Sequence, residues 1–120
     1  MLIKVLKGKL HRGTVTDSKL HYPGSVGIDP DLYEAAGMVP YEHVLIADLN
    51  NGNRLETYVV PAERGSGHIN ILGAAAQLVK KGDLVIVMAF GLCTPEEAQT
   101  LKPKVVVLGE DNEVLETPGA

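Results

Sequence analysis

Cysteine, tryptophan and long hydrophobic runs are scarce in this sequence. A single cysteine, Cys93, excludes an intramolecular disulfide and a cysteine-rich zinc site, and four scattered histidines indicate no metal cluster. The longest apolar run, 84–90, is far shorter than the roughly 18 residues of a membrane span. The first residues have neither a long apolar stretch nor a small-residue cleavage site, so no signal peptide is expected. These absences favour a cytoplasmic protein with no metal and no membrane partner.

Basic residues are also outnumbered, and they are unevenly distributed. The chain has 11 Lys and Arg against 15 Asp and Glu, a net charge of −4. Residues 1–24 hold five basic residues and one acidic residue. Residues 25–120 hold six basic and 14 acidic residues. This balance argues against nucleic-acid binding. The basic opening segment is either a solvated strand edge or a surface for a small anion.

The length of 120 residues, 45% of them hydrophobic, fits one domain, 1–120, with its own core. Glycine and proline total 20 residues and divide the chain into short segments, which predicts many short strands. The expected strands are 2–15, 43–49, 54–60, 68–72, 83–90, 104–108 and 113–116. The expected short helices are 29–37, 73 to about 80–82, and 94–101, and the tail 117–120 should fray. The pattern indicates a mainly β fold with short helices, closed as a small barrel.

Three local signals support these boundaries. Asp29 before Pro30 is a helix start, and Asn51-Gly52 is a strong turn between two strands. Thr94 and Glu97 match a capping box. Along the strand 54–60, alternation places Arg54, Glu56 and Tyr58 on one face and Thr57 on the other.

The dipeptide Gly24-Ser25 offers unusual chemistry. A serine in a strained turn can attack the carbonyl before it, giving an ester by an N→O acyl shift. Elimination then cleaves the chain, and hydrolysis leaves an N-terminal pyruvoyl group, an electron sink. The dipeptide alone is weak, since Gly65-Ser66 has the same residues and is expected to be a simple loop.

The surrounding sequence is much more specific. Short blocks of this sequence resemble the aspartate 1-decarboxylase family, and they occur in the family's order and at its spacing. The match becomes sparse only after Phe90. The matching blocks are Lys9-Leu10-His11-Arg12, Thr14-Val15-Thr16, Leu20-His21-Tyr22, Gly24-Ser25, Asn51-Gly52, Arg54, Thr57-Tyr58, Glu63-Arg64-Gly65-Ser66-Gly67, Gly73-Ala74-Ala75-Ala76 and Gly82-Asp83-Leu84-Val85-Ile86.

The resemblance implies a six-stranded double-psi β-barrel assembled as a homotetramer. It implies self-cleavage into 1–24 and 25–120, with Ser25 becoming a covalent pyruvoyl cofactor. The implied reaction converts L-aspartate to β-alanine and CO2 for pantothenate and coenzyme A synthesis. The substrate amine condenses with the pyruvoyl carbonyl, which takes up the electrons as the α-carboxylate departs.

The resemblance also assigns roles to individual residues. Aspartate has two carboxylates, and the cations Arg54 and Lys9 are candidate anchors, unless they are ordinary surface charges. Tyr58 corresponds to the residue that donates the proton to Cα, or else it packs in the barrel wall. Thr57 corresponds to a residue that takes part in processing and contacts the substrate. Thr57 points away from Tyr58 on an ideal strand, which a bulge or a site between subunits would reconcile.

Two further groups of residues each have two possible roles. Gly73, Ala74 and Ala75 form either a backbone cradle for a carboxylate or a tight turn. Flanking positions are either supporting site residues or surface polar groups; they are His11, His21 and Tyr22.

The chain departs from the family at two positions. The family usually has asparagine where this chain has Leu72, and leucine donates no hydrogen bond to the scissile carbonyl. Asn70, two residues earlier on the same face, is a possible substitute. Pro23 restricts the loop before Gly24, either pre-bending it or hindering the shift.

Three other functions stay open. One is a pyruvoyl decarboxylase of another small acidic amino acid. Another is a barrel that stays unprocessed or needs a processing helper. The last is a DNA-binding barrel, which the net charge disfavours.

Overall fold

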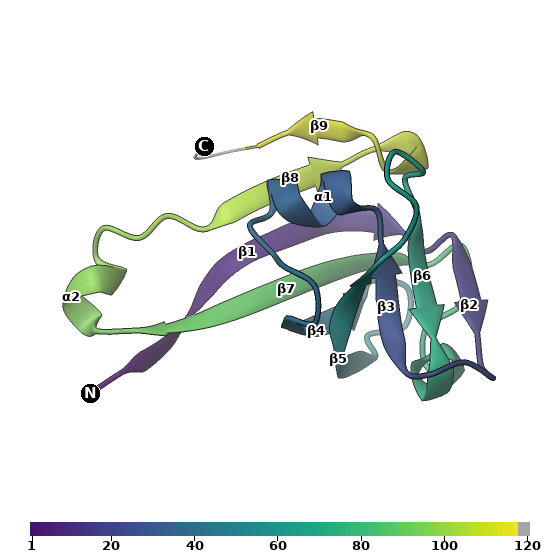
Figure 1. Cartoon of the computed structure of the whole chain (residues 1–120), viewed down its shortest axis with the longest axis horizontal. Coiled ribbons are helices and arrows are strands. Elements are labelled where there is room, and N and C mark those ends of the chain that lie inside the picture. The colour runs from purple at the N-terminus through teal and green to yellow at the C-terminus, as the bar shows by residue number, and fades with distance from the viewer. Residues whose placement is uncertain (118–120) are drawn as a thin grey trace.

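Nine strands make up most of the computed structural model, which describes residues 1–117 (Figure 1). The strands are β1 (Ile3–Thr14), β2 (Asp17–Lys19), β3 (Ser25–Ile28), β4 (His43–Asp48), β5 (Arg54–Pro61), β6 (Ile69–Leu72), β7 (Leu84–Cys93), β8 (Lys104–Leu108) and β9 (Val114–Glu116). The helices are short: α1 (Pro30–Ala35), α2 (Pro95–Ala98) and the 3-10 turns η1 (Gly73–Gln77) and η2 (Glu110–Asn112). The strand order is β2-β6-β3-β5-β4-β7-β1-β8-β9.

The longest strands, β1 and β7, form an antiparallel ribbon that extends away from the other strands. Their pairing runs from Ile3 opposite Cys93 to Thr14 opposite Leu84, with irregularities at Leu6/Gly8 and His11/Gly13. Figure 1 shows this ribbon reaching toward the N-terminus and α2, away from β2, β3 and β6. The ribbon gives the molecule its long axis of 43 Å, against 29 and 25 Å for the others.

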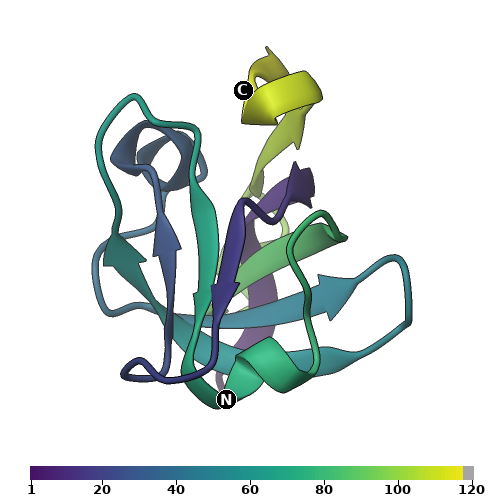
Figure 2. The ribbon, with the colours of Figure 1, turned by 90° about the vertical axis from the view of Figure 1, so that its right-hand side faces the viewer.

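Strand β3 lies between two strands that come much later in the chain. It pairs in parallel with β5 and antiparallel with β6, so that Val26 faces Val59 on one side and Ile71 on the other. These three side chains are fully buried. Figure 2 shows η1 at the bottom of the view, at the same end as the loop that joins β2 to β3.

The core follows from alternation along the strands. In β7, every second residue from Val85 to Ala89 is buried, and the intervening residues are partly exposed. The buried set is dominated by β-branched and leucine side chains, which pack well on a pleated surface. The strand predicted at 83–90 is therefore confirmed as β7, with one face fully buried in the core and the other partly exposed.

Most predicted elements are confirmed, with shifts at their ends. Asp29 caps α1 by accepting a hydrogen bond from the Asp31 N–H, and Thr94 and Glu97 form the predicted capping box. The helix expected to reach 80–82 ends at Gln77. Strand β7 continues to Cys93, and β2 and β3 were not predicted. The predicted fraying of 117–120 falls mostly on 118–120, outside the described residues.

The prediction of a mainly β fold is confirmed, whereas closure into a barrel is not. The fold is mainly β as expected, but it has nine strands rather than six, and within residues 1–117 no pairing joins β2 to β9. The additional strands include β2 and β9, which are only three residues long and sit at the two edges. Among the described residues, no helix has the length and apolar character needed to cross a membrane.

Candidate active site

The Gly24–Ser25 bond lies where the chain changes from exposed to buried. The loop Leu20–Gly24 is exposed, whereas Ser25 begins β3 and its side chain is only 5% exposed. The Ser25 hydroxyl donates a long hydrogen bond, 3.5 Å, to the Pro23 carbonyl. Apart from Gly24 itself and its two chain neighbours, no described residue has an atom within 4 Å of the place where a Cβ of Gly24 would be. Space is therefore available at Gly24, and the serine side chain is held under the loop that contains the bond.

Gly73 packs directly against this loop. A Cβ on Gly73 would lie 2.6 Å from the Gly24 Cα and 3.0 Å from the Tyr22 carbonyl oxygen. Gly73 also has a φ of +86°, a left-handed conformation that side chains other than hydrogen disfavour. Two features therefore require glycine at position 73. One is its left-handed backbone conformation, and the other is the close approach of the Gly24 backbone.

A hollow of about 380 Å³ opens beside the Gly24–Ser25 bond. Six of its lining residues were candidates from the sequence: Gly24, Thr57, Tyr58, Leu72, Ala74 and Ala75. Leu55, Glu56 and Leu78 also line it and were missed. The alternation along β5 could have identified Leu55 as the inward neighbour of Thr57, but no local signal marks Leu78.

Thr57 and Tyr58 contribute to the hollow from opposite faces of β5. Tyr58 is 38% exposed, and its ring centroid lies 6.2 Å from that of Tyr41. The pairing of β5 with β4 runs in register from Arg54 to Tyr58, so no bulge turns Thr57 toward Tyr58. Both residues nevertheless line the same hollow. A bulge is therefore not needed to bring them to one site.

The expected cations lie outside this hollow. Lys9 and His11 are on β1, paired with β7 and β8, and Arg54 is exposed at the start of β5. The His11 Nδ1 atom is buried and has no hydrogen-bond partner among the described residues. Burial, followed by the charges of Lys9 and Arg12, lowers the pKa of His11. One copy of the chain therefore gathers the scissile bond, Tyr58 and the backbone at Ala74 and Ala75, but not the cations Lys9 and Arg54.

The remaining candidates are on the surrounding strands and loop. His21 and Tyr22 are in the exposed loop, with the Lys19 ammonium 5.2 Å from the Tyr22 ring centroid. Asn70 pairs with Gly27 rather than Ser25, and its Oδ1 accepts a hydrogen bond of 2.6 Å from the Thr16 hydroxyl. The position opposite Ser25 belongs to Leu72.

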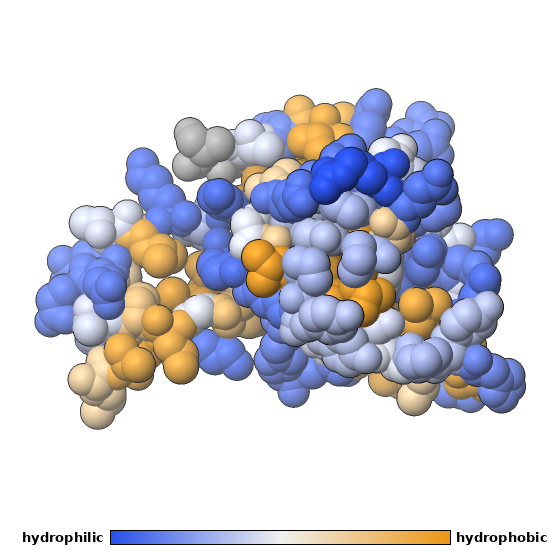
Figure 3. Space-filling view, viewed as in Figure 1, coloured by the Kyte–Doolittle hydropathy of each residue, from blue (hydrophilic) through white to orange (hydrophobic). Residues whose placement is uncertain are grey.

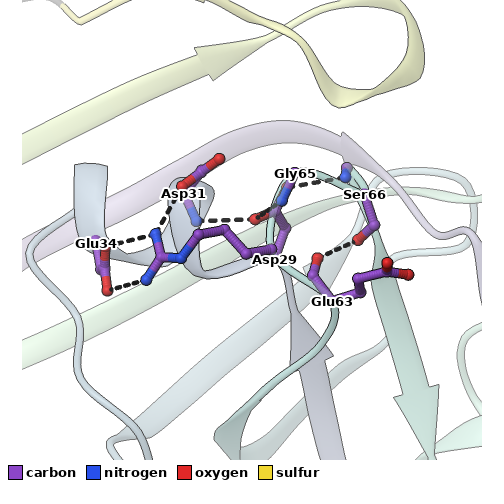
Figure 4. Close-up of polar contacts among 8 residues, drawn as sticks. Asp29, Asp31, Glu34, Glu63, Gly65 and Ser66 are labelled. Atoms are coloured by element: carbon purple, nitrogen blue, oxygen red, sulfur yellow. Dashed lines mark hydrogen bonds and ion pairs between the residues drawn. The ribbon is translucent and has the colours of Figure 1, made fainter.

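A buried carboxylate fixes the far end of β3 (Figure 4). Asp29, 3% exposed, accepts hydrogen bonds from the backbone N–H groups of Asp31, Gly65 and Gly67 at 2.8–3.0 Å. Burial alone would raise the pKa of Asp29, but these N–H groups and the nearby Arg64 charge hold it below its ordinary value. Arg64 in turn binds the carboxylates of Asp31 and Glu34. The loop that contains Gly65-Ser66, which the sequence predicts as a simple loop, is thus tied to the strand that begins with Ser25.

A second hollow of similar size, about 390 Å³, lies on another side of η1. Its lining includes Ser18, Gln77, Lys80 and Lys81. It contains neither residue of the scissile bond and neither Thr57 nor Tyr58, so it is not the candidate site.

Comparison with known proteins shows which family the chain resembles over most of its length. A family model described as aspartate decarboxylase matches residues 1–115. Relatives named aspartate 1-decarboxylase include one from Acetivibrio thermocellus, 51% identical over 96% of this chain and 91% of its own. One from Thermosipho africanus is 53% identical over 93% and 92%. One from Bacillus cereus is 49% identical over 100% and 94%.

Proposed function

This chain belongs to the aspartate decarboxylase family, and from that membership we propose that it converts L-aspartate to β-alanine and CO2 through a pyruvoyl group made from its own Ser25. The decarboxylation of aspartate is a carboxy-lyase reaction, and the proposal includes the use of the β-alanine for pantothenate and coenzyme A synthesis, as the sequence resemblance implies. The observation that carries the proposal is the position of the Gly24–Ser25 bond, packed against Gly73 and open to a hollow that Thr57 and Tyr58 share.

The pyruvoyl group would arise from the chain by self-cleavage. The Ser25 Oγ attacks the Gly24 carbonyl carbon, and the peptide C–N bond breaks, leaving an ester and a free amine on residue 25. Loss of the Ser25 Cα proton expels the Gly24 carboxylate and leaves dehydroalanine. Water then replaces the nitrogen, which departs as ammonia, and a keto group remains. The burial of Ser25 and the contact of its hydroxyl with the Pro23 carbonyl support the first step, because they keep the hydroxyl beside the backbone of the loop.

The site fits a pyruvoyl group because its carbonyl would be at the buried start of β3, next to the hollow. When present, the group supplies an electrophilic carbonyl that binds the substrate amine and accepts the electron pair left by CO2. Tyr58 Oη would donate the proton that the substrate Cα then takes up. The backbone at Gly73, Ala74 and Ala75 would contact a substrate carboxylate, because Ala74 and Ala75 line the hollow.

We further propose that the complete site forms between copies of the chain in a homotetramer, with a double-psi barrel in each copy. Lys9 and Arg54 would anchor the two carboxylates of aspartate, yet neither lines the hollow beside Ser25 in one copy. Exposed apolar side chains also gather over the ribbon of β1 and β7 (Figure 3), including Met1, Leu2 and Leu92. Such a surface is typical of a protein–protein contact. The parallel pairs β1·β8 and β3·β5, within a mainly β fold, support a barrel of this kind.

An activity assay with two matched serine variants tests the proposed function. The wild-type protein should form β-alanine and CO2 from L-aspartate, and little product from L-glutamate. Ser25→Ala should abolish the reaction. Ser66→Ala, at the other Gly-Ser dipeptide, should retain it, because Ser66 bonds only to its own loop through Glu63 and His68. Equal activity in Ser25→Ala and wild type would contradict the proposal, and preference for another amino acid would revise the substrate.

A mixing experiment tests the shared site. Lys9→Ala and Ser25→Ala chains, each inactive alone, should regain activity when co-expressed if Lys9 acts in a neighbouring copy's site. Monomeric protein with full activity would contradict the tetramer.

A further inference from the structure

Tyr41, in the segment before β4, has a backbone conformation that tyrosine rarely adopts. Its φ is +70°, in the left-handed region. Asp111 and Asn112 share this region, but their short polar side chains tolerate it, whereas a bulky ring makes it unfavourable. The Tyr41 ring is 75% exposed, so packing in the core does not compensate for the strain. Strained residues cluster at functional sites, and the surface contacts of Tyr41 are therefore informative about function.

The backbone of Tyr41 is attached to β5 next to Tyr58. The Tyr41 N–H donates a hydrogen bond of 2.6 Å to the Val59 carbonyl, and the Val59 N–H donates to the Glu42 carbonyl at 3.0 Å. The ring centroids of Tyr41 and Tyr58 are 6.2 Å apart, and the ring planes are tilted by 31°. This distance is within the range in which aromatic pairs attract each other. The left-handed residue thus places its ring against the ring of Tyr58.

Tyr58 lies beside the residue that would carry the reactive group. Val59 pairs with Val26 in the parallel pairing of β5 with β3, and the residues immediately before these two are Tyr58 and Ser25. Tyr58 also lines the hollow, whereas Tyr41 does not. Tyr41 therefore contacts the ring of Tyr58 from outside the part of the site where a substrate would bind.

Two other neighbours of Tyr58 are engaged with each other. His43 is directly opposite Tyr58 in the pairing of β4 with β5, and Glu56 is the previous residue on the same face of β5. The Nε2 atom of His43 lies 3.2 Å from the Oε1 atom of Glu56. Tyr58 is 38% exposed, which leaves its ring room for more than one staggered rotamer. The aromatic contact with Tyr41 favours one of these rotamers over the others.

We propose that Tyr41 is a positioning residue for Tyr58, and that its ring holds the Tyr58 hydroxyl at the hollow. The inference rests on the proposed function, in which Tyr58 Oη gives a proton to the substrate Cα. A proton donor acts only within hydrogen-bond reach of its target, so rotamers that turn the hydroxyl away are inactive. An aromatic pair changes the population of a state by about 2- to 12-fold. The left-handed backbone lowers the folding constant by about 5- to 30-fold, so Tyr41 reduces stability while it orders the site.

Tyr41→Asn separates a positioning role from a structural one. Asparagine tolerates the left-handed backbone, so urea unfolding should show a stability equal to or above that of the wild type, and self-cleavage should be unchanged. The kcat for aspartate should fall by about 2- to 12-fold, with little change in KM because Tyr41 does not line the hollow. Tyr41→Phe keeps the ring and should keep the wild-type kcat. Val39→Asn, which removes another exposed apolar side chain of the same segment, should keep it too.

Two outcomes of this comparison would overturn the proposal. One is a wild-type kcat in Tyr41→Asn. The other is a loss of stability that accompanies the loss of kcat, because that result is typical of a structural role.

A double variant and a rotamer measurement locate the effect at Tyr58. Tyr41→Asn should not slow Tyr58→Phe any further, because the hydroxyl that Tyr41 positions is already absent, and the same fold-loss in both backgrounds would overturn the proposal. Full turnover by Tyr58→Phe would instead contradict the proton donor of the proposed function. Coupling constants of carbon-13-labelled tyrosine should show one dominant χ1 rotamer of Tyr58 in wild type and Tyr41→Phe, and several in Tyr41→Asn. Equal rotamer populations in wild type and Tyr41→Asn would overturn the positioning role even if neither protein forms β-alanine.

Discussion

Leu72 lies directly opposite Ser25 in the antiparallel pairing of β6 with β3. The residue across from the attacking serine therefore has an apolar side chain that donates no hydrogen bond. Asn70, the polar residue nearest along the same strand, faces Gly27 and holds the Thr16 hydroxyl instead.

We expect slow self-cleavage in the wild-type protein and faster cleavage in Leu72→Asn. Negative charge develops on the Gly24 carbonyl oxygen during attack, and one well-placed donor is worth about 100- to 1000-fold in rate. Denaturing gels over time measure the loss of intact chain. Leu72→Ala is the control, because it removes bulk without adding a donor. Asn70→Ala should leave the rate unchanged. If Asn70→Ala slows cleavage, Asn70 is the donor; if no variant alters the rate, Thr57 is the next candidate.

Gly73→Ala should block self-cleavage, whereas Gly82→Ala should not. Both glycines have a left-handed φ, +86° and +91°, so alanine costs each about 1–2 kcal/mol of backbone strain. Only at Gly73 would the new Cβ collide with the backbone of Gly24, since nothing lies within 4 Å at Gly82. Unfolding measurements should show the larger stability loss in Gly73→Ala, and gels over time should show loss of intact chain in Gly82→Ala but not in Gly73→Ala. Normal cleavage in Gly73→Ala would contradict the close approach as a requirement.

Tyr58→Phe should cleave normally but form β-alanine slowly. The ring and its contact with Tyr41 are kept, and only the hydroxyl at the hollow is lost. Loss of a general acid lowers the rate by about 100- to 10,000-fold. Comparing CO2 release with β-alanine formation shows whether the block follows decarboxylation. Tyr41→Phe serves as the control, and full turnover by Tyr58→Phe would assign the proton to another group.

The local chemistry of the sequence was enough to predict the elements that depend on neighbouring residues. The turn at Asn51-Gly52 and the capping box of Thr94 and Glu97 specify their own geometry. Strand β3 has no such signal: its four residues become a strand only by pairing with β5 and β6, more than 30 residues away. The family resemblance located Ser25, Thr57 and Tyr58, but it could not show that Lys9 and Arg54 lie outside the hollow.

Asp29→Asn should destabilise the protein near neutral pH and have less effect in acid. The amide would place a donor against one of three backbone N–H groups, at a cost of about 2 kcal/mol. The folded-state pKa of Asp29 is lowered, so its stabilisation is present above the unfolded pKa and is lost as pH falls through the folded pKa. Denaturant unfolding at several pH values measures this. Asp31→Asn, which loses only an exposed pair with Arg64, should change stability by less than about 1 kcal/mol.

The intact mass of the purified, active protein tests the central claim most directly. We expect two chains, residues 1–24 and 25–120, with the larger chain lacking a free amine and carrying a keto group that reacts with a hydrazine. Ser25→Ala should give one uncleaved, inactive chain. Decarboxylation of aspartate by a preparation that contains only the intact 120-residue mass would contradict the account.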